Sequence, residues 1–186
     1  MKRIFVAIPV KLEPQLLDLI ERLKTQLKEE EIRWVSPKNY HLTLHFFGNV
    51  NLGNEEVIGR LLEEAISGQR SFQFQLNGLR FFNKGEHPQV LFIDVAECAE
   101  LNELAAKMKE LLKKNGFPIA TQKFRPHLTI ARMKSVKDLE RLSIILNQSS
   151  EGLRQIVNVR ELTLYESELH PTGAVYKPLN EFILEG

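Results

Sequence analysis

The feature that most constrains this fold is an internal repeat of a strand followed by a helix. Apolar residues with the spacing of one helix face occupy positions 16–27, and the same stripe recurs 85 residues later at positions 101–112. Each stripe follows a short β-branched and aromatic run, at 4–10 and at 90–95, that is typical of a buried strand. A chain built this way is predicted to be an α+β protein made of two similar lobes.

The repeat continues into a strand with a distinctive polar pair. His41–Leu44 (His-Leu-Thr-Leu) recurs 86 residues later as His127–Ile130 (His-Leu-Thr-Ile). Strand–helix–strand units are common, but here both copies deliver the same polar pair at the same place. We predict that the lobes join near residues 83–89. Before the first motif we expect a polar link through Trp34 and 36–37, and we expect the motif strand to end at Gly48. A helix at 54–67 and a strand around 72–76 should follow. After the second motif, a Ser135–Asp138 capping box should open a helix that runs to about Asn147, and strands are expected at 156–165 and 174–184.

Side chains two residues apart on a strand share a face. His41 and Thr43 therefore share one face, and His127 and Thr129 share another, while the intervening leucines point to the core. If a pseudo-twofold axis relates the lobes, these faces meet across one groove. Two imidazoles and two hydroxyls would then converge on one small ligand.

These side chains suit hydrolysis of a phosphodiester. The pKa of histidine is about 6.5, so one imidazole can be neutral while the other is protonated. The neutral ring can take a proton from water and the charged ring can give one to the leaving oxygen. Threonine hydroxyls can donate to the phosphate oxygens. One histidine alone would be read as an ordinary strand residue, and a metal site would need a third ligand that neither motif supplies.

The two motifs resemble those of a known family. The stretches 39–48 (NYHLTLHFFG) and 124–132 (FRPHLTIAR) are similar to the signature motifs of the two-histidine (2H) phosphoesterases, and within them to the RNA 2′,3′-cyclic phosphodiesterases, also called 2′-5′ RNA ligases. The opening segment 3–8 and the segment 164–167 are also similar to that family. The resemblance covers nearly the whole chain.

The resemblance implies a bilobal fold with antiparallel-rich sheet and flanking helices around a central groove, as one domain over residues 1–186 built from two intertwined lobes. It implies hydrolysis of an RNA 2′,3′-cyclic phosphate to a 2′-phosphate without a cofactor or metal. By position, His41 matches the donor to the departing 3′ oxygen and His127 matches the acceptor that activates water. Thr43 and Thr129 match the hydroxyls that hold the phosphate.

Two further residues are candidates for binding the phosphate. Arg132 matches a basic residue that follows the family's second motif, and a guanidinium suits phosphate oxygens. Its strand parity relative to His127 is wrong, so the strand should end or twist before it. His45 has the parity to join His41 and Thr43, at a place where the family often has lysine or arginine.

Composition narrows the partners. The net charge is +1, from 25 Lys and Arg against 24 Asp and Glu, so an RNA role should rest on a local site that reads a terminus. Cys98 is the only cysteine, and no apolar stretch is long enough to span a membrane. We expect a cytoplasmic monomer that binds an RNA terminus or a nucleoside 2′,3′-cyclic phosphate. The alternatives are an enzyme whose main role is to join or cleave 2′-5′ linkages, and a non-catalytic RNA-end binding module.

Overall fold

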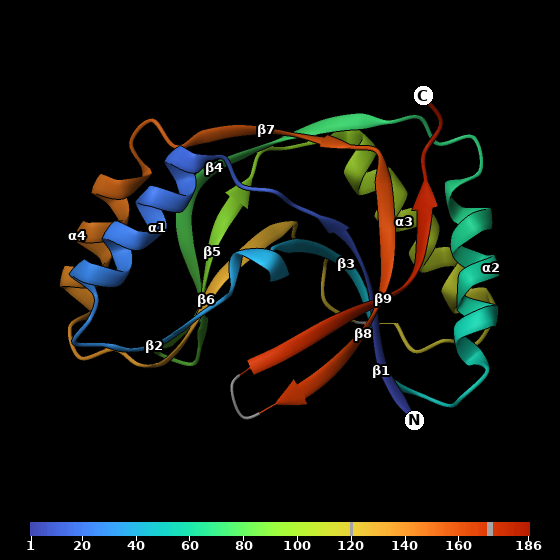
Figure 1. Ribbon diagram of the computed structural model, residues 1–186, viewed down its shortest axis with the longest axis horizontal. Coiled ribbons are helices and arrows are strands. Elements are labelled where there is room, and N and C mark those ends of the chain that lie inside the picture. Colours follow the sequence, from blue (N-terminus) through green and yellow to red (C-terminus); the bar gives the residue numbers. More distant parts are fainter. Residues whose placement is uncertain (120, 171–172) are drawn as a thin grey trace.

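The computed structural model describes residues 1–119, 121–170 and 173–186 (Figure 1). These residues form an α+β fold, which confirms the predicted class. The elements in chain order are β1 (Lys2–Pro9), α1 (Pro14–Gln26), β2 (Glu31–Trp34), a 3-10 turn (Pro37–Asn39), β3 (His41–Val50), α2 (Asn54–Ile66), β4 (Phe72–Lys84), β5 (His87–Val95), α3 (Ala99–Lys114), β6 (His127–Ser135), α4 (Leu139–Ser150), β7 (Arg154–Val159), β8 (Glu161–His170) and β9 (Gly173–Ile183).

The nine strands form one sheet with the order β7-β4-β5-β6-β3-β1-β8-β9, and β2 pairs with β6. The pairs of named strands are antiparallel. The two central strands, β6 and β3, correspond to each other, and so do their outer neighbours, β5 and β1. These are the strands of the sequence repeat, so the repeat is a symmetry of the sheet about its middle.

The helices are exchanged between the two halves of the sheet. Helix α1 follows β1, yet it packs against α4, which covers β4 in the other half. Helix α3 follows β5 and packs in return against α2 and β3. Figure 1 shows α1 with α4 at one end of the molecule and α2 with α3 at the other. Each copy of the repeat therefore contributes its first helix to the half built around the other copy's strands.

The two halves share one hydrophobic core. Leu42 of β3 and Leu128 of β6 are both fully buried and belong to the same apolar cluster. Helix α1 begins at Pro14, where the missing N–H of proline costs nothing. Its apolar stripe begins two residues later and buries Leu16 and Ile20. None of the helices in the described part of the chain combines the length and apolar character needed to cross a membrane.

Residues 83–89 do not join two lobes, contrary to the prediction. Lys84 pairs with His87 in the tight turn between β4 and β5, which lie side by side in the same half of the sheet. The composition that suggested a linker is the composition of a hairpin turn, where Gly85 has a φ of 63°.

Three other boundaries differ from prediction. Strand β3 does not stop at Gly48 but continues to Val50, because the glycine adopts a φ of 73° at an irregularity within the pairing with β1. The cap of α4 is Asp138, whose carboxylate accepts from the backbone N–H of Arg141 at 2.8 Å, and Ser135 still belongs to β6. The expected strand at 156–165 is two strands, β7 and β8, separated at residue 160.

The expected polar link before the first motif contains a short strand. Residues Glu31–Trp34 form β2, which pairs with the outer part of β6 from Ala131 to Ser135. The alternation of half-buried and exposed residues over these four positions is too short to distinguish from a loop by pattern.

Candidate active site

The two motifs meet at the seam between the halves of the sheet. Leu42 of β3 lies opposite Leu128 of β6 in an antiparallel register. Extending this register by one residue in each direction sets each histidine opposite the threonine of the other motif, with His41 across from Thr129 and Thr43 across from His127. His41 and His127 are then diagonal neighbours, which in antiparallel pairs lie roughly 7–8 Å apart. The seam therefore brings the four predicted residues together on one face.

Both imidazoles are fixed in the same way. Nδ1 of His41 lies 2.7 Å from the carbonyl oxygen of Asn39, and Nδ1 of His127 lies 2.8 Å from that of Arg125. A carbonyl can only accept, so each Nδ1 carries the hydrogen. Nε2 is then the atom available for chemistry, as a base when the ring is neutral and as an acid when it is charged. The shared contact to the residue two positions back follows from the sequence repeat.

Aromatic rings hold each imidazole in place. The ring centroid of His41 lies 4.9 Å from that of Phe5 and 5.1 Å from that of Tyr176, which meets it edge-on. The centroid of His127 lies 4.9 Å from that of Phe82, at an interplanar angle of 88°. These contacts leave each ring little rotational freedom. Composition did not single out Phe5 or Tyr176, because an aromatic residue in a strand is usually part of the core.

The environment lowers the pKa of His41 from its ordinary value of 6.5. Burial is the largest cause, because it penalises the charged form. The carbonyl of Asn39 opposes this effect, and the positive charges of His127 and Arg132 add to the lowering. The two histidines are thus close enough for the charge of one to disfavour protonation of the other.

The pKa of His127 is also lowered, and again burial is the main cause. Its contact with the carbonyl of Arg125 favours the charged ring, whereas the guanidinium groups of Arg125 and Arg132 disfavour it. Asp94, its cross-strand neighbour on β5, raises the pKa slightly and is itself bound to Arg80 at 2.7 Å. The cross-strand neighbour of His41 is Pro9, so the environments of the two histidines are not identical.

Arg132 reaches the groove because β6 contains a bulge. The register with β5 shifts between Leu91 and Phe92, which leaves Ile130 as an extra residue on β6. A bulge reverses the alternation of faces. Arg132 consequently lines the same cavity as His41. Strand β6 continues past Arg132, and the bulge corrects the strand parity that the sequence alone indicates.

A corresponding bulge separates His45 from His41. Thr43 pairs with Ala7 of β1, but His45 pairs with the next residue, Val6, so one residue of β3 has no partner between them. Val6 is fully buried in the core, and His45 is half-buried. His45 therefore does not line the cavity that holds His41 and Arg132, but it lines a neighbouring cavity with Thr43 and His127. Its contact with the phosphate stays a prediction.

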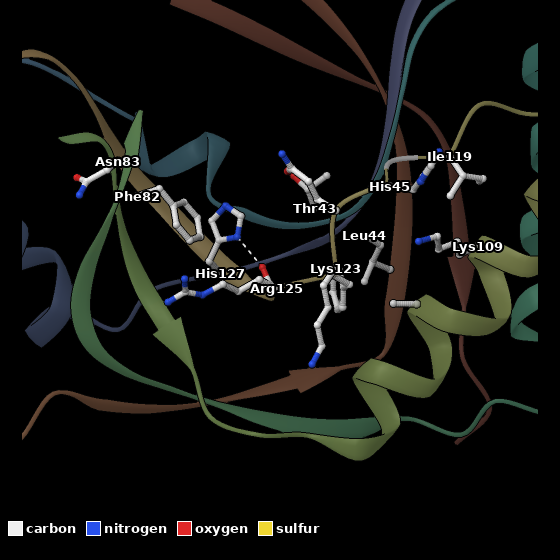
Figure 2. Close-up of a pocket in the computed structure, with 13 residues that line it drawn as sticks. Thr43, Leu44, His45, Phe82, Asn83, Lys109, Ile119, Lys123, Arg125 and His127 are labelled. Carbon is white, nitrogen blue, oxygen red and sulfur yellow. Dashed lines mark hydrogen bonds between the residues drawn. The ribbon is translucent and has the colours of Figure 1, made fainter. Parts of the chain in front are cut away.

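The seam divides the groove into two chambers. The first chamber, about 280 Å³, is lined by His41, Thr43 and Arg132 together with residues of β1, β8 and β9, including Arg3, Phe5 and Tyr176. The second chamber, about 540 Å³, is lined by His127 and Thr43 together with residues of β4, α3 and the segment before β6 (Figure 2). Thr43 borders both, so a ligand at the seam can contact both histidines.

The donor set at the seam is nitrogen and hydroxyl oxygen without carboxylates at its centre. In residues 1–119, 121–170 and 173–186, no cluster of three or more His, Cys, Asp or Glu side chains has an arrangement that could hold a metal ion. The chemistry available from the described side chains is proton transfer by imidazole, hydrogen bonding by hydroxyl groups and charge stabilisation by arginine.

Comparison with known proteins agrees with this arrangement. Residues 8–171 match the model of the 2′-5′ RNA ligase superfamily. The chain is 36% identical over 187 aligned residues to an RNA 2′,3′-cyclic phosphodiesterase of Archaeoglobus fulgidus, covering 97% of this chain and 99% of the relative. It is 32% identical to an enzyme of the same name from Thermotoga maritima, covering 99% and 96%.

Solved structures share the fold. A protein of Thermus thermophilus superposes with a TM-score of 0.78 at 24% identity, covering 99% of this chain and 98% of that one. E. coli LigT in complex with 3′-AMP superposes with a TM-score of 0.76 at 23% identity, covering 98% of both chains. Sequence and fold agree, and the chain belongs to the 2′-5′ RNA ligase superfamily.

Proposed function

We propose that this protein is an RNA 2′,3′-cyclic phosphodiesterase that opens the terminal cyclic phosphate to a 2′-phosphate without a metal. The observation that carries the proposal is the pair of imidazoles at the seam, each with Nδ1 bound to a carbonyl and Nε2 free for a shared ligand. The relatives from A. fulgidus and T. maritima, which carry this name, support it.

In the proposed reaction, neutral His127 accepts a proton from water at Nε2 as the water oxygen attacks phosphorus. The bond between phosphorus and the 3′ oxygen breaks, and protonated His41 donates its Nε2 proton to that oxygen. The product is a 2′-phosphate beside a 3′-hydroxyl. Thr43 and Thr129 donate hydrogen bonds to the non-bridging oxygens, and Arg132 offsets their negative charge.

We propose further that residues 1–186 act as a single domain of two intertwined lobes, as a monomer in the cytoplasm. The exchanged helices α1 and α3 and the common core support the single domain. One chain supplies both histidines, so the site needs no second copy. A lone buried cysteine, Cys98, is consistent with a reducing compartment.

The test is incubation of an RNA oligonucleotide bearing a 2′,3′-cyclic phosphate in the presence of EDTA, with the position of the product phosphate determined. We expect a 2′-phosphate product from the wild type and a rate about 10²–10⁴-fold lower for His41→Ala or His127→Ala. His87→Ala, at an exposed histidine away from the groove, is the matched control and should retain activity. Binding of the RNA end without turnover would instead indicate a binding module, and a 3′-phosphate product would contradict the assigned proton roles.

A further inference from the structure

The second chamber is larger than the first chamber, which holds His41 and Arg132. Its volume of about 540 Å³ falls within the range of roughly 300–1,000 Å³ that small-molecule sites occupy. Figure 2 shows His127 at one end and His45 with Lys109 at the other, with Thr43 and Lys123 between them. The chamber therefore extends from the catalytic seam to helix α3.

The charge of this chamber differs from that of the chain. Lys109, Lys123 and Arg125 line it, and none of its described lining residues is acidic. The whole chain carries a net charge of only +1, so this cationic lining is a local concentration of charge. A cavity with such a lining attracts anions, and lysine and arginine are the side chains that bind phosphate oxygens.

The same chamber has apolar surfaces of a size suited to a base. Phe82, Phe124 and Ile119 contribute to its lining, and the guanidinium of Arg125 lies 4.8 Å from the ring centroid of Phe82. Aromatic rings and arginine planes stack on nucleobases with little regard to base identity. The combination of rings and cations is that of a site for a nucleotide.

His45 adds an unused polar atom at the far end. Its Nε2 is buried and has no hydrogen-bond partner among the described residues, although the backbone of Pro118 lies close enough to the ring to raise its pKa against the larger lowering by burial. A buried polar atom without a partner costs free energy. The bulge in β3 that separates His45 from His41 is what places it in this chamber.

We infer that the second chamber binds a second nucleotide unit, whose phosphate lies near Lys109 and Lys123 and whose base lies against the apolar wall. This inference rests on the proposed function, because it assumes that the cyclic phosphate occupies the seam. The unit comes either from the strand that carries the cyclic phosphate or from a separate strand that ends in a 5′-hydroxyl. In both cases the enzyme recognises more than one nucleotide.

The first arm of the test compares adenosine 2′,3′-cyclic phosphate with a trinucleotide, ApApA, ending in the same cyclic phosphate. We expect kcat/KM to be about tenfold higher for the trinucleotide, the size expected for two exposed charge contacts of roughly 0.7 kcal/mol each. Lys109→Ala/Lys123→Ala should abolish this preference and change the rate on the mononucleotide less than about twofold, since exposed substitutions rarely disturb the fold. Lys113→Ala, on the exposed face of the same helix, is the control and should keep the preference.

The second arm measures inhibition of mononucleotide hydrolysis by the unmodified dinucleotide ApA, which has a 5′-hydroxyl and no cyclic phosphate. Inhibition that the double lysine variant weakens about tenfold, without a trinucleotide preference, would assign the chamber to a separate strand. Equal rates on both substrates with no inhibition by ApA would overturn the inference while leaving the proposed function intact. Failure to hydrolyse either cyclic substrate would instead contradict the proposed function.

Discussion

Replacing Arg132 separates two effects that the geometry assigns to one side chain. Its guanidinium lines the first chamber with His41, and its charge lowers the pKa of His41 and of His127. A hydrogen bond to a charged group contributes about 1.5–3 kcal/mol. The side chain is exposed, so solvent screens it and the lower figure applies. Loss of about 1.5 kcal/mol corresponds to a roughly 12-fold decrease in kcat/KM.

The assay measures kcat/KM on a 2′,3′-cyclic nucleotide as a function of pH for Arg132→Met and Arg132→Lys. We expect Arg132→Met to lose about 12-fold at the optimum and to shift the profile to higher pH, because removing a positive charge favours protonated histidine. Arg132→Lys should keep the wild-type profile and lose several-fold in rate, since lysine retains the charge without the planar fork.

Arg22→Met, at an exposed position on α1, is the matched control and should leave rate and profile unchanged. Titration of the His41 and His127 ring protons by NMR reports the same pKa shifts directly. A fully active Arg132→Met variant would refute the placement of this guanidinium at the phosphate. Unchanged histidine pKa values in that variant would show that the charge of Arg132 does not lower the pKa of either ring.

Four further predictions concern pH and stability. If His41 and His127 are the acid and the base, kcat/KM should peak below pH 6.5, because the pKa of each is lowered from 6.5 in the folded protein, and a peak above pH 7.5 would contradict this. The unfolded chain binds more protons than the native one between the lowered pKa values and 6.5, so the free energy of unfolding measured with denaturant should fall as pH drops through that window. Leu128→Ala at the buried seam should cost about 2–5 kcal/mol of that free energy, whereas the exposed Leu52→Ala should cost less than about 0.5 kcal/mol. Asp138→Ala should cost about 1 kcal/mol through loss of the α4 cap, and an unchanged denaturation midpoint would argue against the cap.

The sequence was sufficient to predict what depends on local pattern. The period of the repeat identifies corresponding strands, and the two-residue spacing within each motif places a histidine and a threonine on one face. The symmetric sheet order and the pairing of Leu42 with Leu128 agree with both predictions.

The sequence could not show the features that depend on how two strands pair or on how the two halves of the sheet pack together. The bulges opposite Ala7 and Leu91 decide that Arg132 lines one cavity with His41 and that His45 does not, and register of this kind depends on the partner strand. The exchange of α1 and α3 likewise depends on tertiary packing. An apolar helix stripe shows that a face is buried but does not identify the sheet that buries it.

The most direct test of the account asks whether the two imidazoles act on one phosphorus atom in one step. It compares kcat on a 2′,3′-cyclic-phosphate oligonucleotide for His41→Ala, His127→Ala and the double variant. Groups that act as a unit are strongly non-additive, so we expect each single variant to lose about 10²–10⁴-fold and the double variant to be no worse than the poorer single one. Losses that multiply in the double variant would show that the histidines act independently and would contradict the shared site.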